Sequence, residues 1–152
     1  MLNSYSLSLQ DYGQIIIRLF FATLFGALIG WERQTKDKSA GLRTHILVSL
    51  GSALLILIPM LLNPDSRDIN AISRAIQGIA TGIGFLGAGE IWRDTQTTTK
   101  KPPIHGLTSA AAIWVASGLG IAAGAGLWQL GLVGTTMVLI VLRLIKKFEH
   151  YL

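Results

Sequence analysis

The sequence contains no cysteine among its 152 residues, and this absence removes several kinds of chemistry. Disulfides, thiolate metal ligands and cysteine nucleophiles are all excluded, while the redox compartment is left undetermined. No serine or threonine stands in a glycine-flanked turn with an ordered base, so nucleophilic hydrolysis is not indicated either. We therefore predict that the protein is not an enzyme and uses no cofactor.

Charged residues are also few in this sequence. Only 14% of the residues are charged, 51% are hydrophobic, and the mean hydropathy is +0.52. Such a composition suits lipid better than water, so we predict an integral membrane protein whose first partner is the lipid bilayer. The formal net charge is +5, but the basic residues fall between apolar runs rather than on one face. We therefore expect no nucleic-acid partner.

Five apolar stretches are long enough to cross the hydrocarbon core of a bilayer as helices. No charged residue occurs from Gly106 to Leu142, which is too long for a single span. A reversal is expected at 124–128, because glycine tolerates tight turns and tryptophan favours the membrane interface. The sequence predicts an all-α, polytopic bundle in one domain, residues 1–152, without a soluble C-terminal domain. The predicted spans are 12–31, 44–62, 72–92, 107–123 and 127–145.

Lysine and arginine indicate how the spans are oriented, since positively charged short loops tend to stay in the cytoplasm. Basic residues gather after the first predicted span, after the third and after the last. The other connections contain few of them. We predict that the N-terminus lies outside the cytoplasmic membrane and the C-terminus lies in the cytoplasm.

Glycine is abundant, with 17 residues, most of them inside the predicted spans. Small residues spaced four apart allow helices to approach closely in lipid. The densest segment, 78–89, has two interpretations: tight helix crossing on several sides, or a broken or close-approach helix that lines an ion or substrate site. The candidate packing glycines are Gly26, Gly30, Gly78, Gly82, Gly84, Gly87, Gly89, Gly120 and Gly124.

Ionisable groups near the membrane boundary are the best candidates for ligand binding or gating, because such groups are costly at membrane depth and are seldom left unpaired. Glu32 and Arg33 close the first span, and Arg43, Thr44 and His45 open the second across a short loop. We expect them to meet at the cytoplasmic face. The alternative is that the arginines anchor helix ends at lipid phosphates.

Four further candidates stand at span ends, and Thr108, at the start of the fourth span, is one of them. Arg74 begins the third span and Glu90 lies near its end. Arg74 is expected to anchor the helix at the lipid headgroups and Glu90 to form an interfacial ion pair; alternatively, both are parts of a gate. His45 and His105 open the second and fourth spans at the same face, where imidazole serves an interfacial role, pH sensing or metal binding. The histidine spacing does not indicate zinc, whereas hydrated magnesium needs only one or two carboxylates, so the metal question stays open.

Three blocks of sequence occur in order between Gly26 and Trp128: "GALIGWERQTKDKSAGLRTHILVSLGSALL", "SRAIQGIATGIGFLGAGEIW" and "HGLTSAAAIWVASGLGIAAGAGLW". Together they resemble the MgtC/SapB family of bacterial membrane proteins. The resemblance implies a small multi-pass protein of the bacterial inner membrane and, for some members, a link to growth at low magnesium and survival inside host cells. The matching positions are Gly30, Glu32, Arg33, Gly41, Leu42, Arg43, Thr44, Arg74, Gly82, Gly84, Phe85, Leu86, Gly87, Ala88, Gly89, Gly106, Leu107, Thr108, Ala110, Ala111 and Trp114.

The chain departs from the family pattern at several places. Glu90 stands where an aliphatic residue is expected, Ser109 stands where threonine is frequent, and the loop at 95–103 is long. Longer members carry a soluble C-terminal domain that this sequence does not show.

Two functions are consistent with these features. The first is a regulatory or interaction protein in magnesium and ion homeostasis, which packs against another membrane complex such as the ATP synthase. The second is a transporter or channel for magnesium or another ion, suggested by the glycine-dense third span and its two charged ends. We also predict a homo-oligomer, with a dimer favoured, whose contacts lie at or near the Gly26/Gly30 or Gly78/Gly82 faces.

Overall fold

The computed structural model describes residues 8–62, 69–94 and 106–145, and within them all regular structure is helical. The side chains of 92–94 and 144–145 are outside this description. The prediction of an all-α bundle is confirmed. The elements are α1 (Leu9–Gln34), α2 (Leu42–Leu62), α3 (Ile69–Asp94), α4 (Leu107–Gly124), α5 (Trp128–Ile140) and a short π-helical continuation, η1 (Val141–Ile145).

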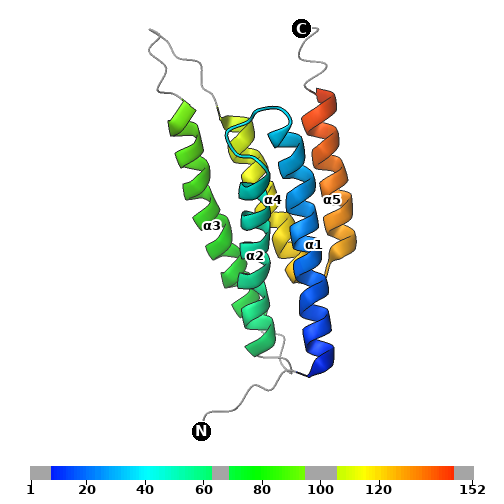
Figure 1. The fold of residues 1–152 in the computed structure, drawn as a ribbon. Helices are drawn as coiled ribbons and strands as arrows, with labels where there is room; N and C mark the ends of the chain where they lie inside the picture. Colours follow the sequence, from blue (N-terminus) through cyan, green and yellow to red (C-terminus); the bar gives the residue numbers. More distant parts are fainter. Residues whose placement is uncertain (1–7, 63–68, 95–105, 146–152) are drawn as a thin grey trace, which may run out of the picture.

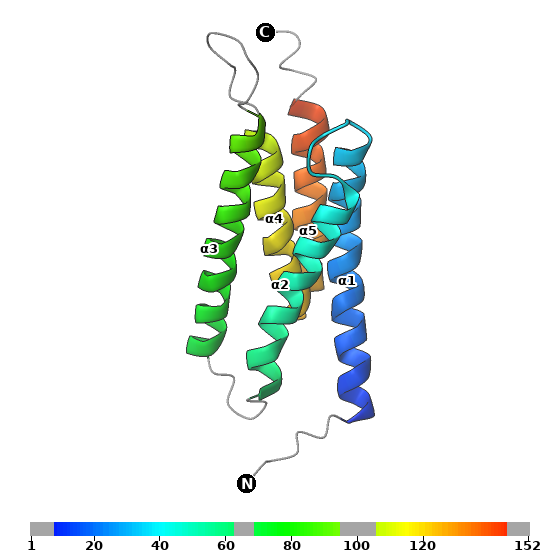
Figure 2. The ribbon, with the colours of Figure 1, turned by 60° about the vertical axis from the view of Figure 1, so that its left-hand side comes forward.

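The helices run side by side in an elongated bundle, and successive helices point in opposite directions (Figures 1 and 2). The α4 helix is central, because it contacts α1, α2, α3 and α5. The α3 helix lies at an edge in both views and contacts only α2 and α4 among the described elements. One long side of α3 is therefore left without a neighbour among the described helices.

The helices differ in whether their length and composition suit a membrane span. The α1, α2 and α4 helices are long and apolar enough to cross a membrane, and Trp128–Arg143 forms a shorter apolar helix. The α3 helix has 26 residues, as many as α1, but polar and glycine residues lower its apolar character. Large apolar side chains are exposed around the bundle, Phe20, Leu47 and Met137 among them. Lipid is the solvent that suits such a surface.

Local signals set the helix ends. The hydroxyl of Ser8 accepts a bond from the amide of Asp11 (3.2 Å), and the Asp11 carboxylate accepts one from the amide of Ser8 (2.8 Å), which closes a capping box at the start of α1. Between α4 and α5 the chain reverses at 125–127, inside the predicted turn. Gly126 adopts φ +82° there, a conformation that side chains disfavour.

Helices in the centre of the bundle approach closely at glycines. A Cβ added to Gly26 would lie 2.6 Å from the His45 carbonyl oxygen, and one added to Gly30 would lie 2.8 Å from the Leu42 Cα. The backbones of α1 and α2 are therefore in direct contact at both glycines. Gly124 of α4 approaches Ala53 of α2 in the same way. Close backbone approach through small residues is the usual route to helix association in lipid.

The glycines of α3 behave differently. A Cβ added to Gly78, Gly82, Gly84 or Gly89 would meet no atom within 4 Å in the part of the chain that the structure describes, whereas one at Gly87 would lie 3.5 Å from the Ala110 Cβ. The segment forms one unbroken helix, so the broken-helix interpretation is wrong for this structure. The Gly26/Gly30 face is occupied by α2, so it is not available for an oligomer contact.

Buried hydroxyls connect the central helices. Ser49 of α2 donates to the Ala22 carbonyl of α1 (2.7 Å), and the Ser52 hydroxyl lies 3.0 Å from that of Ser117 in α4. Ser52 also bonds the Val48 carbonyl (2.8 Å). Because these polar groups are already hydrogen-bonded, they add specificity to the packing without leaving an unpaired group in the interior.

Candidate functional site

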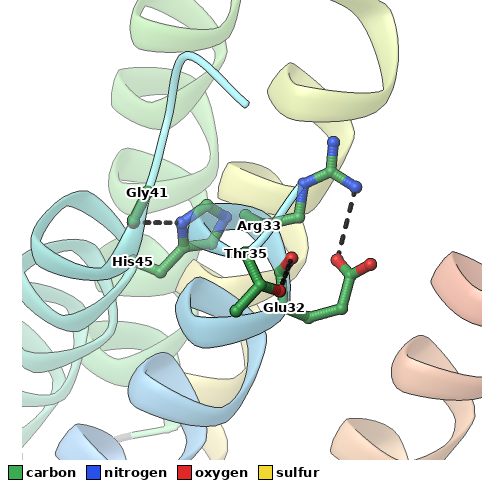
Figure 3. A network of polar contacts seen from close by, with 5 residues as sticks. All are labelled: Glu32, Arg33, Thr35, Gly41 and His45. Atoms are coloured by element: carbon green, nitrogen blue, oxygen red, sulfur yellow. Dashed lines mark hydrogen bonds and ion pairs between the residues drawn. The ribbon is translucent and has the colours of Figure 1, made fainter. Parts of the chain in front are cut away.

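The end of α1 and the start of α2 bring three ionisable side chains into one buried cluster, which we call the polar cluster: Glu32, Arg33 and His45 (Figure 3). Their exposed fractions are 2%, 4% and 0%. The connection at 35–41 is short, and Gly26 and Gly30 let the first turn of α2 lie against α1. The sequence predicted that Arg43 and Thr44 also meet these residues; the structure brings only three of the five together, and Arg43 and Thr44 are exposed.

Each side chain of the polar cluster has one identified polar contact. The His45 Nδ1 donates to the Gly41 carbonyl (2.8 Å), because a carbonyl oxygen can only accept. The Arg33 Nη1 lies 3.5 Å from the Glu32 Oε2, and the two groups point toward each other in Figure 3. The Thr35 hydroxyl donates to the Glu32 carbonyl (2.9 Å) and caps the last turn of α1.

Three polar atoms of the polar cluster make no identified hydrogen bond. Among the described residues, the His45 Nε2, the Glu32 Oε2 and the Arg33 Nε are buried without a hydrogen-bond partner. With its Nδ1 protonated, a neutral His45 presents Nε2 as an acceptor, and the guanidinium Nε is a donor. The cluster therefore combines acceptors and a donor that suit a small polar group. Buried polar atoms without hydrogen bonds are uncommon, which makes the polar cluster a candidate functional site.

The end of α3 is tied to the same end of the bundle. The Ser39 hydroxyl, in the α1–α2 connection, donates to the Glu90 carboxylate of α3. Glu90, Glu32 and Arg33 all lie within electrostatic range of the His45 imidazole. Glu90 thus finds a neutral hydroxyl partner across the gap between α3 and the connection, rather than standing alone at the membrane boundary.

The other predicted site residues lie apart from the polar cluster. Arg43 and Thr44 are exposed on the outer side of the first turn of α2, and Thr108 is exposed at the start of α4. Arg74 is exposed near the start of α3, at the opposite end of the bundle. His105 lies outside the described residues. Among the described residues, no group of three or more His, Asp or Glu side chains is arranged to hold a metal ion.

Sequence reasoning missed the role of Arg18. Its Nη1 donates to the Gly124 carbonyl (2.9 Å) at the last turn of α4 and lies 3.8 Å from the Met60 sulfur. A cation at a helix C-terminus is stabilised by the unpaired carbonyls and the helix dipole. The available signal was that Arg18 is the one charge inside an apolar run. A lone arginine of this kind calls for a buried acceptor.

The fold and its surface define an all-α membrane protein with a buried polar cluster at one end. A model of the MgtC family matches residues 19–151, and the chain belongs to this family. The resemblance to MgtC/SapB proteins is thus confirmed. No solved structure matches the chain.

Three curated relatives illustrate the relationship. SrpB from Synechococcus elongatus is 44% identical over 144 residues, which cover 92% of this chain and 79% of SrpB. The Escherichia coli K12 protein named "Putative magnesium transporter YhiD" is 39% identical over 143 residues, 91% of this chain and 64% of YhiD. MgtC from Salmonella typhimurium is 41% identical over 124 residues, 82% of this chain and 49% of MgtC. The chain therefore spans about half to two thirds of the length of YhiD and MgtC.

Proposed function

We propose that this protein is a multi-pass protein of the bacterial cytoplasmic membrane that supports adaptation to low magnesium and ion homeostasis by binding another membrane protein. Membership of the MgtC family and the magnesium in the name of YhiD support the physiological part. The proposal contains no catalytic step.

A groove between α2 and α3 carries the proposal of an interaction function. It has a volume of about 400 Å³ and an apolar lining, to which Leu47, Leu55 and Leu86 contribute. Gly51, Gly78 and Gly82 also line it, and a Cβ at any of the three would meet no described atom within 4 Å. A membrane helix packs best where small residues let its backbone approach, so this groove suits a helix of a partner protein.

The state of the interior also favours binding over conduction. The hydroxyls of Ser49, Ser52 and Ser117 are engaged in hydrogen bonds between helices. Below the polar cluster, Phe25 and Ile29 are fully buried in an apolar core. An ion would have to break these contacts to pass along the bundle axis.

Growth at limiting magnesium tests the interaction function. A strain without its own copy is complemented with the unaltered protein, with Gly82→Leu, which fills the groove, and with Gly118→Leu. Gly118 is a matched control, because it is also open to its surroundings but lies on α4 outside the groove. We expect the unaltered protein and Gly118→Leu to restore growth and Gly82→Leu to fail at equal abundance. Full rescue by Gly82→Leu would contradict the proposal.

One observation favours transport as a second candidate. His45, Ser49 and Ser52 lie on one side of α2 and extend the polar cluster toward the middle of the bundle. Purified protein in liposomes loaded with a magnesium-sensitive dye separates the two functions. Uptake that depends on the protein would establish transport. Its absence for magnesium, for other cations and for protons would remove this candidate.

The proposed orientation is N-terminus outside and C-terminus in the cytoplasm. Lys36, Lys38 and Arg43 lie at the end of the bundle that also holds Arg143, whereas Arg74 lies toward the other end. The positive-inside rule then places the α1–α2 connection in the cytoplasm. Because the chain has no cysteine, single cysteines at exposed Lys36 and Gln10 can be labelled with an impermeable maleimide on intact cells. We expect labelling at position 10 only.

A further inference from the structure

One stripe on the exposed side of α3 carries polar side chains, and it runs beside Phe85, which is 80% exposed. Arg74, Gln77, Thr81, Gly84 and Ala88 alternate in steps of three and four residues, so they lie on one side of the helix. All five are exposed within the single chain. We call this set the outer stripe. It is distinct from the groove, which is lined by other residues of α3.

With α3 as a membrane span, as the sequence predicts for 72–92, the outer stripe would lie at the depth of the hydrocarbon core. The 26 residues of α3 span about 39 Å, against about 30 Å for the core. In a centred helix Thr81 lies at the midplane, and Gln77 lies about 7 Å from it. Arg74 lies about 11 Å from the midplane, where its long side chain reaches the headgroups. The guanidinium can therefore be solvated in lipid, whereas the amide of Gln77 cannot.

Gln77 is the group that requires a partner. Its side-chain Nε2 lies 3.4 Å from the Ser73 hydroxyl, a long contact, and among the described residues no hydrogen bond to its side-chain Oε1 is identified. The Thr81 hydroxyl is satisfied by the Gln77 backbone carbonyl (2.9 Å). A polar side chain at this depth normally faces protein or water, because lipid offers no hydrogen bonds.

We propose that the outer stripe is the contact between two copies of this chain, paired in parallel through α3 about a two-fold axis. A step of three and four residues is the spacing of left-handed helix pairs. A two-fold axis brings each residue against its own copy, and a side-chain amide is self-complementary, since it both donates and accepts. Gly84 and Ala88 add small residues that let the backbones approach. The pairing goes beyond the proposed function and does not depend on it.

Disulfide cross-linking in native membranes tests the pairing, and the absence of cysteine makes single-cysteine variants clean. Thr81→Cys and Gly84→Cys lie on the outer stripe. Val133→Cys is the control, because Val133 is 59% exposed near the middle of α5, away from α3. We expect oxidation to convert the two stripe variants to covalent dimers and to leave the control monomeric.

Gln77→Leu provides an independent measurement. Removing an interhelical amide bond should weaken dimerisation about 3- to 30-fold, measured by analytical ultracentrifugation in mild detergent, with Gln77→Asn closer to the unaltered protein. Three results would each overturn the pairing: no dimer from either stripe cysteine in folded protein, equal cross-linking of Val133→Cys, or cross-linking of the stripe only to a different protein.

The growth assay separates this inference from the proposed function. A Gln77→Leu variant that is monomeric at unchanged thermal stability and still restores growth at low magnesium leaves both statements standing. The unaltered protein then forms the dimer, but growth does not require it. A chain whose stripe cysteines fail to cross-link but which restores growth overturns the pairing alone. A chain that cross-links but never restores growth, even unaltered, overturns the function alone.

Discussion

Alanine at two glycines of α4 should have opposite effects on stability, although the two positions are only two residues apart. A Cβ at Gly120 would lie 2.7 Å from the Ser49 carbonyl carbon and 2.8 Å from its Cα, and these are backbone atoms of α2 that cannot rotate away. A Cβ at Gly118 would meet no described atom within 4 Å. Both residues lie within the same helix, so their intrinsic helix preferences match.

The matched pair isolates the cost of the helix contact. Replacing glycine by alanine in a helix gains about 1 kcal/mol of intrinsic preference at either site. Forcing an extra methyl group into a packed contact costs about 1–3 kcal/mol. The difference between the two variants is therefore about 1–3 kcal/mol, because the preference cancels. For a chain of this size that corresponds to about 2–12 °C in midpoint temperature.

Thermal unfolding followed by circular dichroism in one mild detergent measures this difference. We expect Gly118→Ala to unfold at or above the temperature of the unaltered protein and Gly120→Ala to unfold below it. The double variant should show the sum of the two shifts, since Gly118 does not touch the contact. Equal midpoints for the two single variants would refute the claim that α2 and α4 touch through backbone at Gly120.

Further variants examine the buried polar groups by the same unfolding measurement. Arg18→Met should lose about 1.5–3 kcal/mol, since a charged donor leaves the last turn of α4, and Arg18→Lys should lose less; unchanged midpoints would contradict this role. Ser52→Ala should cost about 1–3 kcal/mol by leaving the Ser117 hydroxyl without this partner, and Ser117→Ala should cost less, because the Ser52 hydroxyl keeps its bond to the Val48 carbonyl (2.8 Å); the double variant should cost less than the sum, whereas strict additivity would exclude the bond between the two hydroxyls. Glu32→Gln should cost about 3 kcal/mol, the lower end for a broken buried pair because the separation from Arg33 is 3.5 Å, and adding Arg33→Gln should recover part of it.

Much of the fold could be predicted because its signals are local. Each predicted span falls on a helix, and the reversal near Gly124 follows from glycine in an uncharged run. Apolar length is a one-dimensional property, and in lipid a helix must satisfy its own backbone hydrogen bonds. The structure of the glycine-dense segment of α3 was harder to predict, since the same residues suit both an unbroken helix with uncovered faces and a helix with a break. Only the neighbours of α3 distinguish these two.

The candidate site could be predicted in part for a similar reason. Glu32, Arg33 and His45 flank one short connection, so their meeting follows from chain proximity. The contact between Ser39 and Glu90 could not be predicted, because it joins segments whose relation depends on the position of α3 at the bundle edge. Nothing in the sequence favours Ser39 as the partner of Glu90 over the charged residues that lie nearer to Glu90 along the chain.

The sequence by itself determined that lipid surrounds the helices, where the helices lie and to which family the chain belongs. Composition, the length of apolar runs and ordered blocks of residues are all properties of the linear chain. The tertiary structure decided which glycines serve the interior and which remain open. Gly26 and Gly120 pack against the backbone of α2, while Gly82 faces the groove and Gly84 faces outward. All of them are glycines within apolar helices, and only the rotation and position of each helix against its neighbours determines which atoms each one meets.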